Sequence, residues 1–404
     1  MDESIPQISE PPTAGNPPMR RDALRDLAAL FLRLGTIAMG GPAAHIAMME
    51  DEVVRRRRWM THERFLDMLG VCNLIPGPNS TEMAIHIGQE RAGLAGLVVA
   101  GACFIFPAAA IVLIIAWAYV RFGAMPQAAG LLYGVKPVII AVVLQALWGL
   151  GRSAIKSRIL TAIAIVGLAA SILEVNDMIV LLGGGIVMLA IRAFEDRSSA
   201  RAAIAAIPAV ATRASAVKGA ALAATVAGVP FSLITLFLFF LKVGAVLFGS
   251  GYVLLAFIRT DLVDRLRWLT EAQLLDAVAV GQVTPGPVFT TATFIGYLLG
   301  GFRGAVVATL GIFIPSFFFV SISGPLIPRL RRSALAGAFL DGVNVGAWAL
   351  MAAVTLFLAR AAIVDLTTMI LAVSSAFILI RYRLNSAWLV LGGGLVGLAM
   401  IPWR

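Results

Sequence analysis

The sequence has few charged residues for its length. Asp, Glu, Lys and Arg make up 13% of the 404 residues, whereas a soluble domain has about a quarter. Hydrophobic residues make up 60%, and the mean hydropathy is +0.92. A chain of this composition is not an ordinary soluble enzyme, and we predict a polytopic membrane protein.

Cysteine is nearly absent, which excludes several kinds of site. Cys72 and Cys103 both lie in apolar segments, and their spacing fits neither a zinc site nor a disulfide framework, so we expect packed thiols. No nucleotide-binding P-loop is present, which disfavours a pump driven by ATP. We expect no metal, no cofactor and no enzymatic activity.

The formal net charge of +10 comes mainly from Lys and Arg in short loops between apolar runs. This distribution is typical of residues that set membrane topology, and the interleaved basic and aromatic residues of an RNA-binding surface are absent, so we expect no nucleic-acid partner. The N-terminus through Pro18 is polar and rich in proline, without the apolar core of a signal peptide. We predict a disordered tail over residues 1–25.

Two Pro-Gly-Pro motifs interrupt apolar, helix-patterned segments, at residues 76–78 and 285–287. The first proline ends a helix because it lacks an N–H and clashes with the preceding turn, whereas the second suits the start of a new helix. We therefore predict two half-helices joined by a non-helical bridge, which either return to the same side as a re-entrant hairpin, the arrangement we favour, or cross the membrane with a break. Within hydrocarbon such a bridge must be surrounded by protein or a water-filled cavity, and a matching pair points to a transport site.

The two motifs belong to a repeat that covers nearly the whole chain. Trp59 matches Trp268 at an offset of 209 residues, as do the two Pro-Gly-Pro motifs. After the loss of one residue, Gly88 matches Gly296. A match of this length indicates duplication, and with about five spans in each half the two halves would run in opposite directions through the bilayer.

We therefore predict an all-α membrane protein with two homologous halves in an inverted-repeat arrangement, each with about five spanning helices and one broken Pro-Gly-Pro element. The first half is expected over residues 26–194 and the second over residues 229–404, joined by a basic linker over residues 195–228. The segment at residues 50–64 is expected to be a charged loop. The four consecutive arginines of this segment, Arg55 to Arg58, and the linker are assigned to the cytoplasm, which leaves both termini outside.

The candidate binding site consists of the two bridges and the helix N-termini that follow them. Such N-termini carry about half a positive charge and free N–H groups, and the neighbouring hydroxyl and amide side chains add neutral donors. This chemistry suits a tetrahedral oxyanion. The candidate residues are Pro76, Gly77, Pro78, Asn79, Ser80, Thr81, Pro285, Gly286, Pro287, Thr290 and Thr291.

Two further sets of residues are candidates for anion binding. Arg33 and Lys242 occupy the same repeat position in the first span of each half, and they either attract the anion or extend to the membrane interface. Gly40 and Gly41 in the first half, and Gly249 in the second, either precede a further helix N-terminus or allow close packing between helices.

Four ionisable residues lie near the bridges, and two of them, Glu82 and His86, have two alternative roles. Glu82 and His86 lie four residues apart on one helix face, where they could carry a coupling proton. The favoured alternative is an acid near a helix N-terminus and a packed imidazole. Asp67 and Asp276 begin the broken elements and are expected to cap them.

Several sequence strings resemble the chromate transporter family. They are Gly-Gly-Pro-Ala-Ala-His-Ile at residues 40–46, Asp-Glu-Val-Val-Arg at 51–55, Phe-Leu-Asp at 65–67 and Cys-Asn-Leu-Ile-Pro-Gly-Pro-Asn-Ser-Thr at 72–81. The resemblance extends through both halves, as in the long, two-domain form of that family. It implies a multi-pass secondary transporter of the bacterial inner membrane that exports chromate, confers chromate resistance and uses the proton-motive force, with sulfate as a competing oxyanion.

Chromate, with sulfate as a second oxyanion, and membrane lipid are therefore the expected partners, and a homodimer is left open. One rival function is a passive anion channel or a sulfate permease on the same scaffold, which would not move chromate uphill. Another is a non-transporting membrane protein such as an assembly factor or a sensor. The duplicated broken helices argue against that class, because a scaffold does not need them.

Overall fold

The structure is a computed structural model that describes residues 20–39, 41–123, 125–195, 230–248, 253–331, 333–382 and 386–401. The predicted linker and most of the predicted N-terminal tail lie outside these residues, as do Gly40 and Gly249. Within the described ranges the chain forms helices and no strand, as expected for an all-α protein. The first helix begins at Arg20, within the segment predicted as a tail.

The helices of the first half follow the predicted order. They are α1 (Arg20–Ile37), α2 (Gly41–Glu50), the π-helix η1 (Asp51–Arg56), α3 (His62–Cys72), α4 (Asn79–Phe122), α5 (Pro126–Ala154), α6 (Arg158–Ile172) and α7 (Asp177–Glu195). The charged segment at residues 50–64, predicted to be a loop, is thus helical over η1. The long helix α4 has a kink at Ala92 and Gly93 that divides it into two segments.

The second half repeats this order. Its elements are α9 (Leu233–Val246), α10 (Leu254–Ile258), the π-helix η3 (Arg259–Arg265), α11 (Glu271–Val283), the short 3₁₀ helix η4 (Val288–Thr290), α12 (Thr291–Arg331), α13 (Ala334–Ala362), α14 (Leu366–Tyr382) and α15 (Ser386–Ala399). The kink of α12 lies at Gly300 and Gly301, the repeat position of the kink in α4. Gly93 and Gly301 have φ angles of 63° and 58°, which glycine adopts without strain.

The duplication therefore extends to single backbone features. Thr61 accepts a hydrogen bond from the backbone N–H of Arg64 and caps α3, and Thr270 caps α11 in the same way. The prediction that Asp67 and Asp276 cap these helices is wrong. Both lie in the middle of their helices, because the chain turns into the helix at the preceding threonine.

The first Pro-Gly-Pro element is a re-entrant hairpin. Arg64, in the first turn of α3, donates two hydrogen bonds to Glu90, with N–O distances of 3.1 and 2.8 Å. Glu90 lies near the end of the first segment of α4. Because the outer ends of the two half-helices meet, the chain enters and returns on the same side. These hydrogen bonds raise the pKa of the Arg64 guanidinium.

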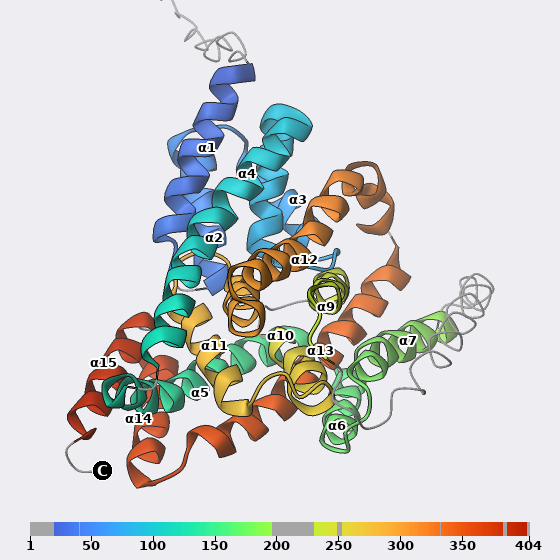
Figure 1. The fold of residues 1–404 in the computed structure, drawn as a ribbon. Coiled ribbons are helices and arrows are strands. Elements are labelled where there is room, and N and C mark those ends of the chain that lie inside the picture. Colours follow the sequence, from blue (N-terminus) through green and yellow to red (C-terminus); the bar gives the residue numbers. More distant parts are fainter. Residues whose placement is uncertain are drawn as a thin grey trace, which may run out of the picture.

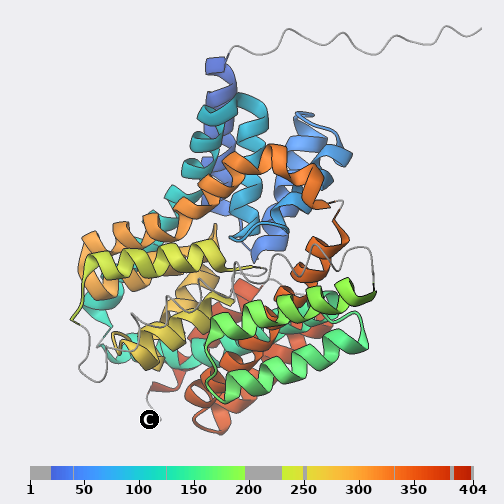
Figure 2. The same ribbon diagram turned by 90° about the vertical axis from the view of Figure 1, so that its right-hand side faces the viewer.

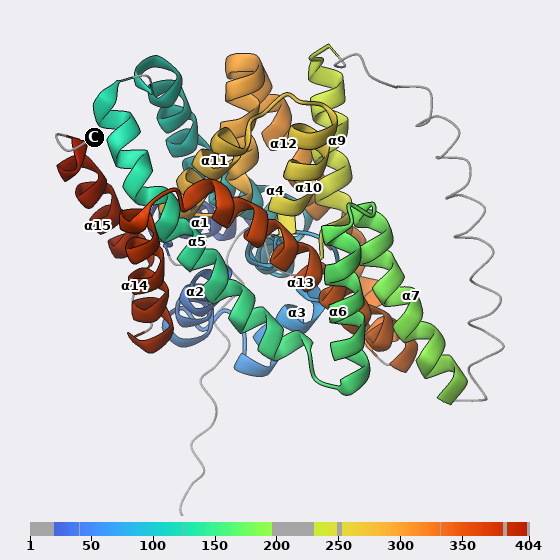
Figure 3. The same cartoon turned by 90° about the horizontal axis from the view of Figure 1, so that it is seen from below.

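The two halves interlock. In Figure 3, α5 lies beside α14 and α15, whereas α13 lies beside α6 and α7. Glycines allow both contacts: a Cβ on Gly134 of α5 would lie 1.9 Å from the carbonyl oxygen of Gly393, and one on Gly342 of α13 would lie 2.2 Å from that of Gly184. Gly184 and Gly393 are the middle residues of two matching runs of three glycines, at residues 183–185 and 392–394, and these runs thus serve the packing between the halves.

The centre of the molecule is the contact between α4 and α12. Figures 1 and 2 show these two long helices side by side, with α1 packed along α4 and α9 packed along α12. Among the described residues, five helical segments are long and apolar enough to span a membrane: α4, α5, α7, residues 288–323 and α13. Shorter apolar helices, α6, α9, α14 and α15, accompany them.

Candidate functional site

The two Pro-Gly-Pro bridges are joined to opposite halves by a reciprocal pair of hydrogen bonds. The N–H of Gly77 donates to the carbonyl oxygen of Leu247 at 2.8 Å, and the N–H of Gly286 donates to that of Ala38 at 2.8 Å. Ala38 and Leu247 follow the first helix of each half at the same repeat position. Both breaks therefore lie at the interface between the halves, enclosed by protein, as a bridge at membrane depth requires.

This arrangement limits what the bridges offer to an anion. The amides of Gly77 and Gly286 already donate to protein carbonyls. An anion can use them only after the two halves separate at this point. In this conformation, therefore, the N–H groups of the two bridge glycines are not free to bind an anion.

Both central glycines are required by geometry. Gly77 has a φ of 140° and Gly286 a φ of 88°. A Cβ on Gly77 would lie 2.2 Å from Oε1 of Glu82 and 2.9 Å from Oγ of Ser316. A Cβ on Gly286 would lie 2.5 Å from Cβ of Ala108. Ala108 and Ser316 occupy the same repeat position, so each bridge packs against the long helix of the opposite half.

The helix starts that follow the bridges differ between the halves. The helix α4 begins directly at Asn79, whose side-chain amide donates to Oδ1 of Asn73 at 2.6 Å. In the second half a 3₁₀ turn precedes α12, and the hydroxyls of Thr290 and Thr291 donate to the carbonyls of Pro287 and Val288, both at 2.8 Å. The donors predicted at Thr290 and Thr291 are thus used within their own turn.

A cluster of buried polar atoms without hydrogen-bond partners lies beside the first bridge. Glu82 is fully buried, and neither of its carboxyl oxygens has a partner in the described part of the chain. The same holds for the hydroxyls of Thr81 and Ser316. Burying a carboxylate without a partner is costly, so this cluster is a functional candidate rather than a contribution to stability.

His86 continues this polar row one turn further along α4. It is 8% exposed, and its Nε2 lies 3.4 Å from Oγ of Ser323 in α12. The structure thus confirms that Glu82 and His86 share a helix face, and that face contacts α12. Ser316 and Ser323 were not among the residues predicted from the sequence. Ser316 could have been predicted, because it follows Pro315 and occupies the repeat position of Ala108.

The two predicted cations form equivalent ion pairs. Arg33 lies 3.3 Å from Glu52, and Lys242 pairs with Asp261, the repeat counterpart of Glu52. These pairs join the first helix of each half to its π-helix. Arg33 and Lys242 are about half exposed, with side-chain exposures of 52% and 42%, so each stands beside an acid rather than alone at membrane depth.

Two cavities occupy equivalent places in the two halves. The larger, which we name the Asn79 cavity, has a volume of about 560 Å³. Its polar lining includes an ion pair between Lys156 and Asp341, 3.6 Å apart. The other polar lining residues are Asn73, Asn79, Ser153, Asn344 and Trp348. Pro42, next to Gly41 at the start of α2, also lines it, so this cavity brings together two of the predicted motifs.

The smaller cavity, the Asp276 cavity, has a volume of about 350 Å³. Lys136 lies 3.0 Å from the buried carboxylate of Asp276, and the hydroxyl of Tyr119 donates to the same carboxylate at 2.8 Å. Tyr133 also lines it. Lys136 and Tyr133 are the repeat counterparts of Asn344 and Asp341, so the two cavities are related by the duplication but carry different charges.

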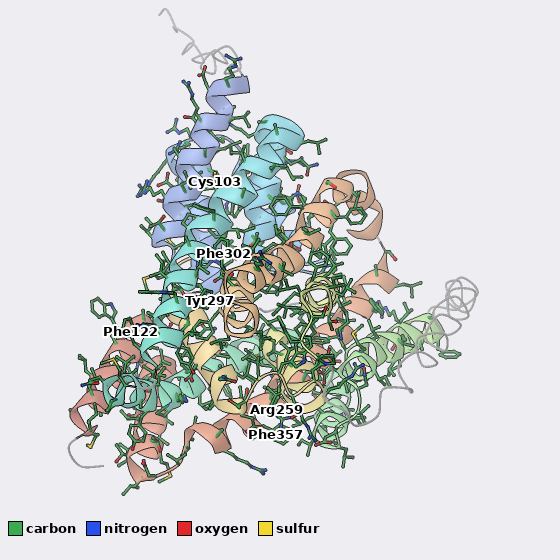
Figure 4. The ribbon with its side chains drawn as sticks, viewed as in Figure 1. Cys103, Phe122, Arg259, Tyr297, Phe302 and Phe357 are labelled. Carbon is green, nitrogen blue, oxygen red and sulfur yellow. The ribbon has the colours of Figure 1, made fainter. Side chains whose placement is uncertain are left out.

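A third charged group lies at the start of η3. Figure 4 shows Arg259 beside Phe357 of α13, and the guanidinium carbon is 4.1 Å from the ring centre. Arg259 also pairs with Asp264 and Glu271, at 3.0 and 3.1 Å. These contacts of the two terminal nitrogens fix the π-helix to α11 and α13, and we assign this arginine no role in binding.

Comparison with known proteins agrees with this architecture. The family described as Chromate transporter matches residues 25–189 and again residues 234–398. A chromate transport protein of Pseudomonas aeruginosa is 34% identical over 397 residues, covering 96% of this chain and 94% of the relative. Another, of Cupriavidus metallidurans, is 32% identical over 385 residues, with 94% of both chains covered. A probable chromate transport protein of Synechococcus elongatus is 30% identical over 355 residues, covering 86% of this chain and 88% of the relative. No solved structure matches the chain.

Proposed function

The chain belongs to the chromate transporter family, and from that premise we propose that it is a secondary active transporter that exports chromate across the bacterial inner membrane and so confers chromate resistance. The observation that supports this most strongly is the match of both halves to the family, together with relatives named chromate transport proteins. The paired bridges at the interface between the halves supply a structural basis for moving an ion.

The Asn79 cavity is the proposed access site for the oxyanion. Chromate is a tetrahedral dianion, and this cavity offers amide donors from Asn73, Asn79 and Asn344 beside the ammonium group of Lys156. Lys156 is 63% exposed and lies 3.6 Å from Asp341, and ion pairs of this exposure contribute little to stability. An incoming dianion can therefore compete with Asp341 for the lysine.

The Asp276 cavity is the proposed counterpart on the opposite side of the membrane. In this structure Lys136 is held by Asp276, whose side chain is only 4% exposed, and Tyr119 donates to the same carboxylate. Among the described residues that line this cavity, the one cation, Lys136, is therefore occupied. We assign the conformation to a state in which the Asn79 cavity can receive the substrate, whereas the lysine of the Asp276 cavity is held by its carboxylate.

Transport between the two cavities would require the bridges to move. The reciprocal hydrogen bonds from Gly77 and Gly286 are the contacts that must break when the halves rock against each other. Breaking them would free two glycine N–H groups beside the helix N-termini at Asn79 and Thr291. The candidate residues of the two bridges thus remain the proposed binding site, in a conformation other than this one. The proposed roles of Arg33 and Lys242 are to raise the potential near the first helices.

The test is uptake of labelled chromate and labelled sulfate into everted membrane vesicles, with and without an uncoupler. An exporter driven by the proton-motive force accumulates chromate inside such vesicles, and the uncoupler abolishes the accumulation. Equilibration without accumulation would instead identify a passive channel. Accumulation of sulfate with exclusion of chromate would identify a sulfate permease. Vesicles from cells that lack the protein give the background.

A further inference from the structure

Three ionisable side chains form a row along one face of α4. Glu82, His86 and Glu90 follow one another at intervals of four residues, which places them on the same side of the helix. The row begins at the fully buried carboxyl of Glu82, beside the first bridge, and ends at Glu90, whose side chain is 44% exposed. It therefore connects the centre of the molecule to the surface on which α3 begins.

The opposite wall of the row is supplied by α12. The hydroxyl of Ser316 lies beside Gly77 and Glu82, and that of Ser323 lies 3.4 Å from Nε2 of His86. These serines are seven residues apart, two turns of the helix. The hydroxyl of Ser323 donates its own proton to the carbonyl of Val320 at 2.7 Å and can accept one from His86. That of Ser316 has no partner in the described part of the chain and is free to donate to Glu82 or accept from it.

Few other charged or titratable groups face this row. From α3, the thiol of Cys72 lies near Glu82, and Arg64 lies near His86 and Glu90. From α12, the described groups that face it are the two serine hydroxyls. Arg64 pairs with Glu90 at the surface, at 2.8 Å, and among the described residues the inner two members of the row have no counter-ion. Neither Glu82 nor His86 lines the Asn79 cavity or the Asp276 cavity, and a proton is a cation that a carboxyl or an imidazole can bind without a cavity.

The second half has no such row. The repeat counterparts of Glu82, His86 and Glu90 are Thr290, Phe294 and Leu298, and Ala108 stands where α12 has Ser316. The broken helix with its Pro-Gly-Pro bridge is duplicated, but every ionisable member of the row belongs to the first half. A role in packing does not explain this, because Thr290, Phe294 and Leu298 fill the same positions in the second half, and the hydroxyl of Thr290 is hydrogen-bonded to Pro287.

We propose that this row is a proton path, in which Glu90 takes up a proton at the surface, His86 relays it and Glu82 holds it beside the bridges. In each step one O–H or N–H bond breaks as another forms: the proton leaves the Glu90 carboxyl for an imidazole nitrogen, and a proton of the resulting imidazolium passes to the Glu82 carboxylate. Neutralising Glu82 removes a negative charge next to the bridge, which favours an arriving dianion. A dianion that moves with one proton keeps a net negative charge, so the membrane potential, negative inside, still drives its export. The inference rests on the proposed transport function and names its coupling ion and route.

The test uses the purified full chain in liposomes with two readouts. The first is proton movement, followed by a pH-sensitive dye in the lumen, when a chromate gradient is applied. The second is exchange of labelled for unlabelled chromate at equal concentrations, which needs no net proton movement. We expect Glu82→Gln and His86→Phe to lower proton movement by about tenfold or more, with exchange retained in Glu82→Gln, whose side chain is permanently neutral. The second variant places the residue of the other half at this position.

Matched variants separate the row from its surroundings. Glu90→Gln removes the proposed surface acceptor, whereas Arg64→Gln breaks the same ion pair and keeps the carboxyl, so only the first should slow proton uptake. Ser316→Ala, which again copies the other half, should slow it while leaving folding intact. His62→Gln, on the exposed His62, serves as a control for changing a histidine.

Each outcome is decisive. Unchanged proton movement in Glu82→Gln would overturn the proposal. If Arg64→Gln and Glu90→Gln slowed proton movement equally, the role proposed for Glu90 would be wrong. Chromate exchange without any proton movement in the unaltered protein would refute the row and leave chromate transport standing. Absence of chromate exchange in the unaltered protein would instead refute the proposed function.

Discussion

The two halves of this protein share a backbone and differ in the chemistry placed on it. Both have a glycine with positive φ in the bridge, a threonine cap on the preceding half-helix and a glycine kink in the following helix. Yet the first bridge is followed by Asn79 and the unpaired carboxyl of Glu82, and the second by threonines whose hydroxyls bond their own turn. After the duplication the backbone features that break the helix remained alike in the two halves, whereas the polar side chains that follow each bridge diverged.

This comparison suggests a division of labour. The second bridge lies against Ala108 and Gly35, with a Cβ on Gly286 placed 2.5 and 3.0 Å from atoms of these residues. In this conformation it is closely packed, and no titratable side chain among the described residues of the opposite half lies against its glycine. The first lies against Ser316 and Glu82, which can change protonation or hydrogen bonding. We expect substitutions in the two bridges to test whether they contribute differently to stability and to transport.

The largest effect is expected from removing both prolines of a bridge. Pro76→Ala with Pro78→Ala should let α3 and α4 run together as one helix, because the missing N–H groups are restored and the steric clash is lifted. We expect transport to be abolished while the protein still inserts into the membrane. The measurement is chromate accumulation in everted vesicles, with membrane-protein yield as the control. Normal accumulation by this double variant would show that the break is not needed.

The central glycines should separate the two bridges further. Gly77→Ala and Gly286→Ala both place a side chain at positive φ, which costs about 1–3 kcal/mol. At Gly77 the added methyl meets the far end of the Glu82 side chain, which can move, whereas at Gly286 it meets Ala108 of another helix. We expect Gly286→Ala to lower the melting temperature in detergent more than Gly77→Ala, and Gly77→Ala to impair transport more than stability. The reverse order would remove the distinction between the bridges.

Much of this architecture could be predicted from sequence because proline and glycine act locally. The breaks at Pro76 and Pro285 and the repeat follow from residue types whose backbone preferences hold in any context. The partners of Gly77 and Gly286 could not be predicted, because hydrogen bonds to Leu247 and Ala38 depend on how the halves pack. The caps were misassigned to Asp67 and Asp276 since several residues near a helix start are equally suitable by type.

The cavities show the same limit on a larger scale. Lys136 and Asp276 are 140 residues apart in sequence, and no local pattern marks them as an ion pair. Ser316 and Ser323 were passed over because serine in an apolar helix is common and gains meaning only from what faces it. The sequence thus indicated which segments depart from ordinary membrane helices, but the contacts between their side chains depend on the tertiary packing.

The two cavities allow a comparison of intermediate size. Lys136→Met removes one partner of a buried pair and leaves Asp276 uncompensated, a change that costs about 3–5 kcal/mol in comparable buried pairs. Lys156→Met breaks a pair whose members are 63% and 41% exposed, which costs about 0–1 kcal/mol. We therefore expect thermal denaturation in detergent to shift strongly for the first variant and little for the second. Chromate uptake by the second should fall nonetheless, through a higher KM, if the Asn79 cavity receives the anion.

The smallest difference is expected between Arg33→Gln and Lys242→Gln. After the first change Glu52 keeps Arg56 and Arg57 as partners, at 3.2 and 3.3 Å. After the second, Asp261 keeps Arg265 as a partner, at 3.5 Å. Because all these basic side chains are partly exposed, each pair contributes about 0–1 kcal/mol, and Lys242→Gln should destabilise slightly more. Melting temperatures measured at low and high salt test this, since salt should diminish the gap between the variants. A large loss of transport in Arg33→Gln at unchanged stability would show that Arg33 does more than pair with Glu52, and would indicate that it contacts the anion.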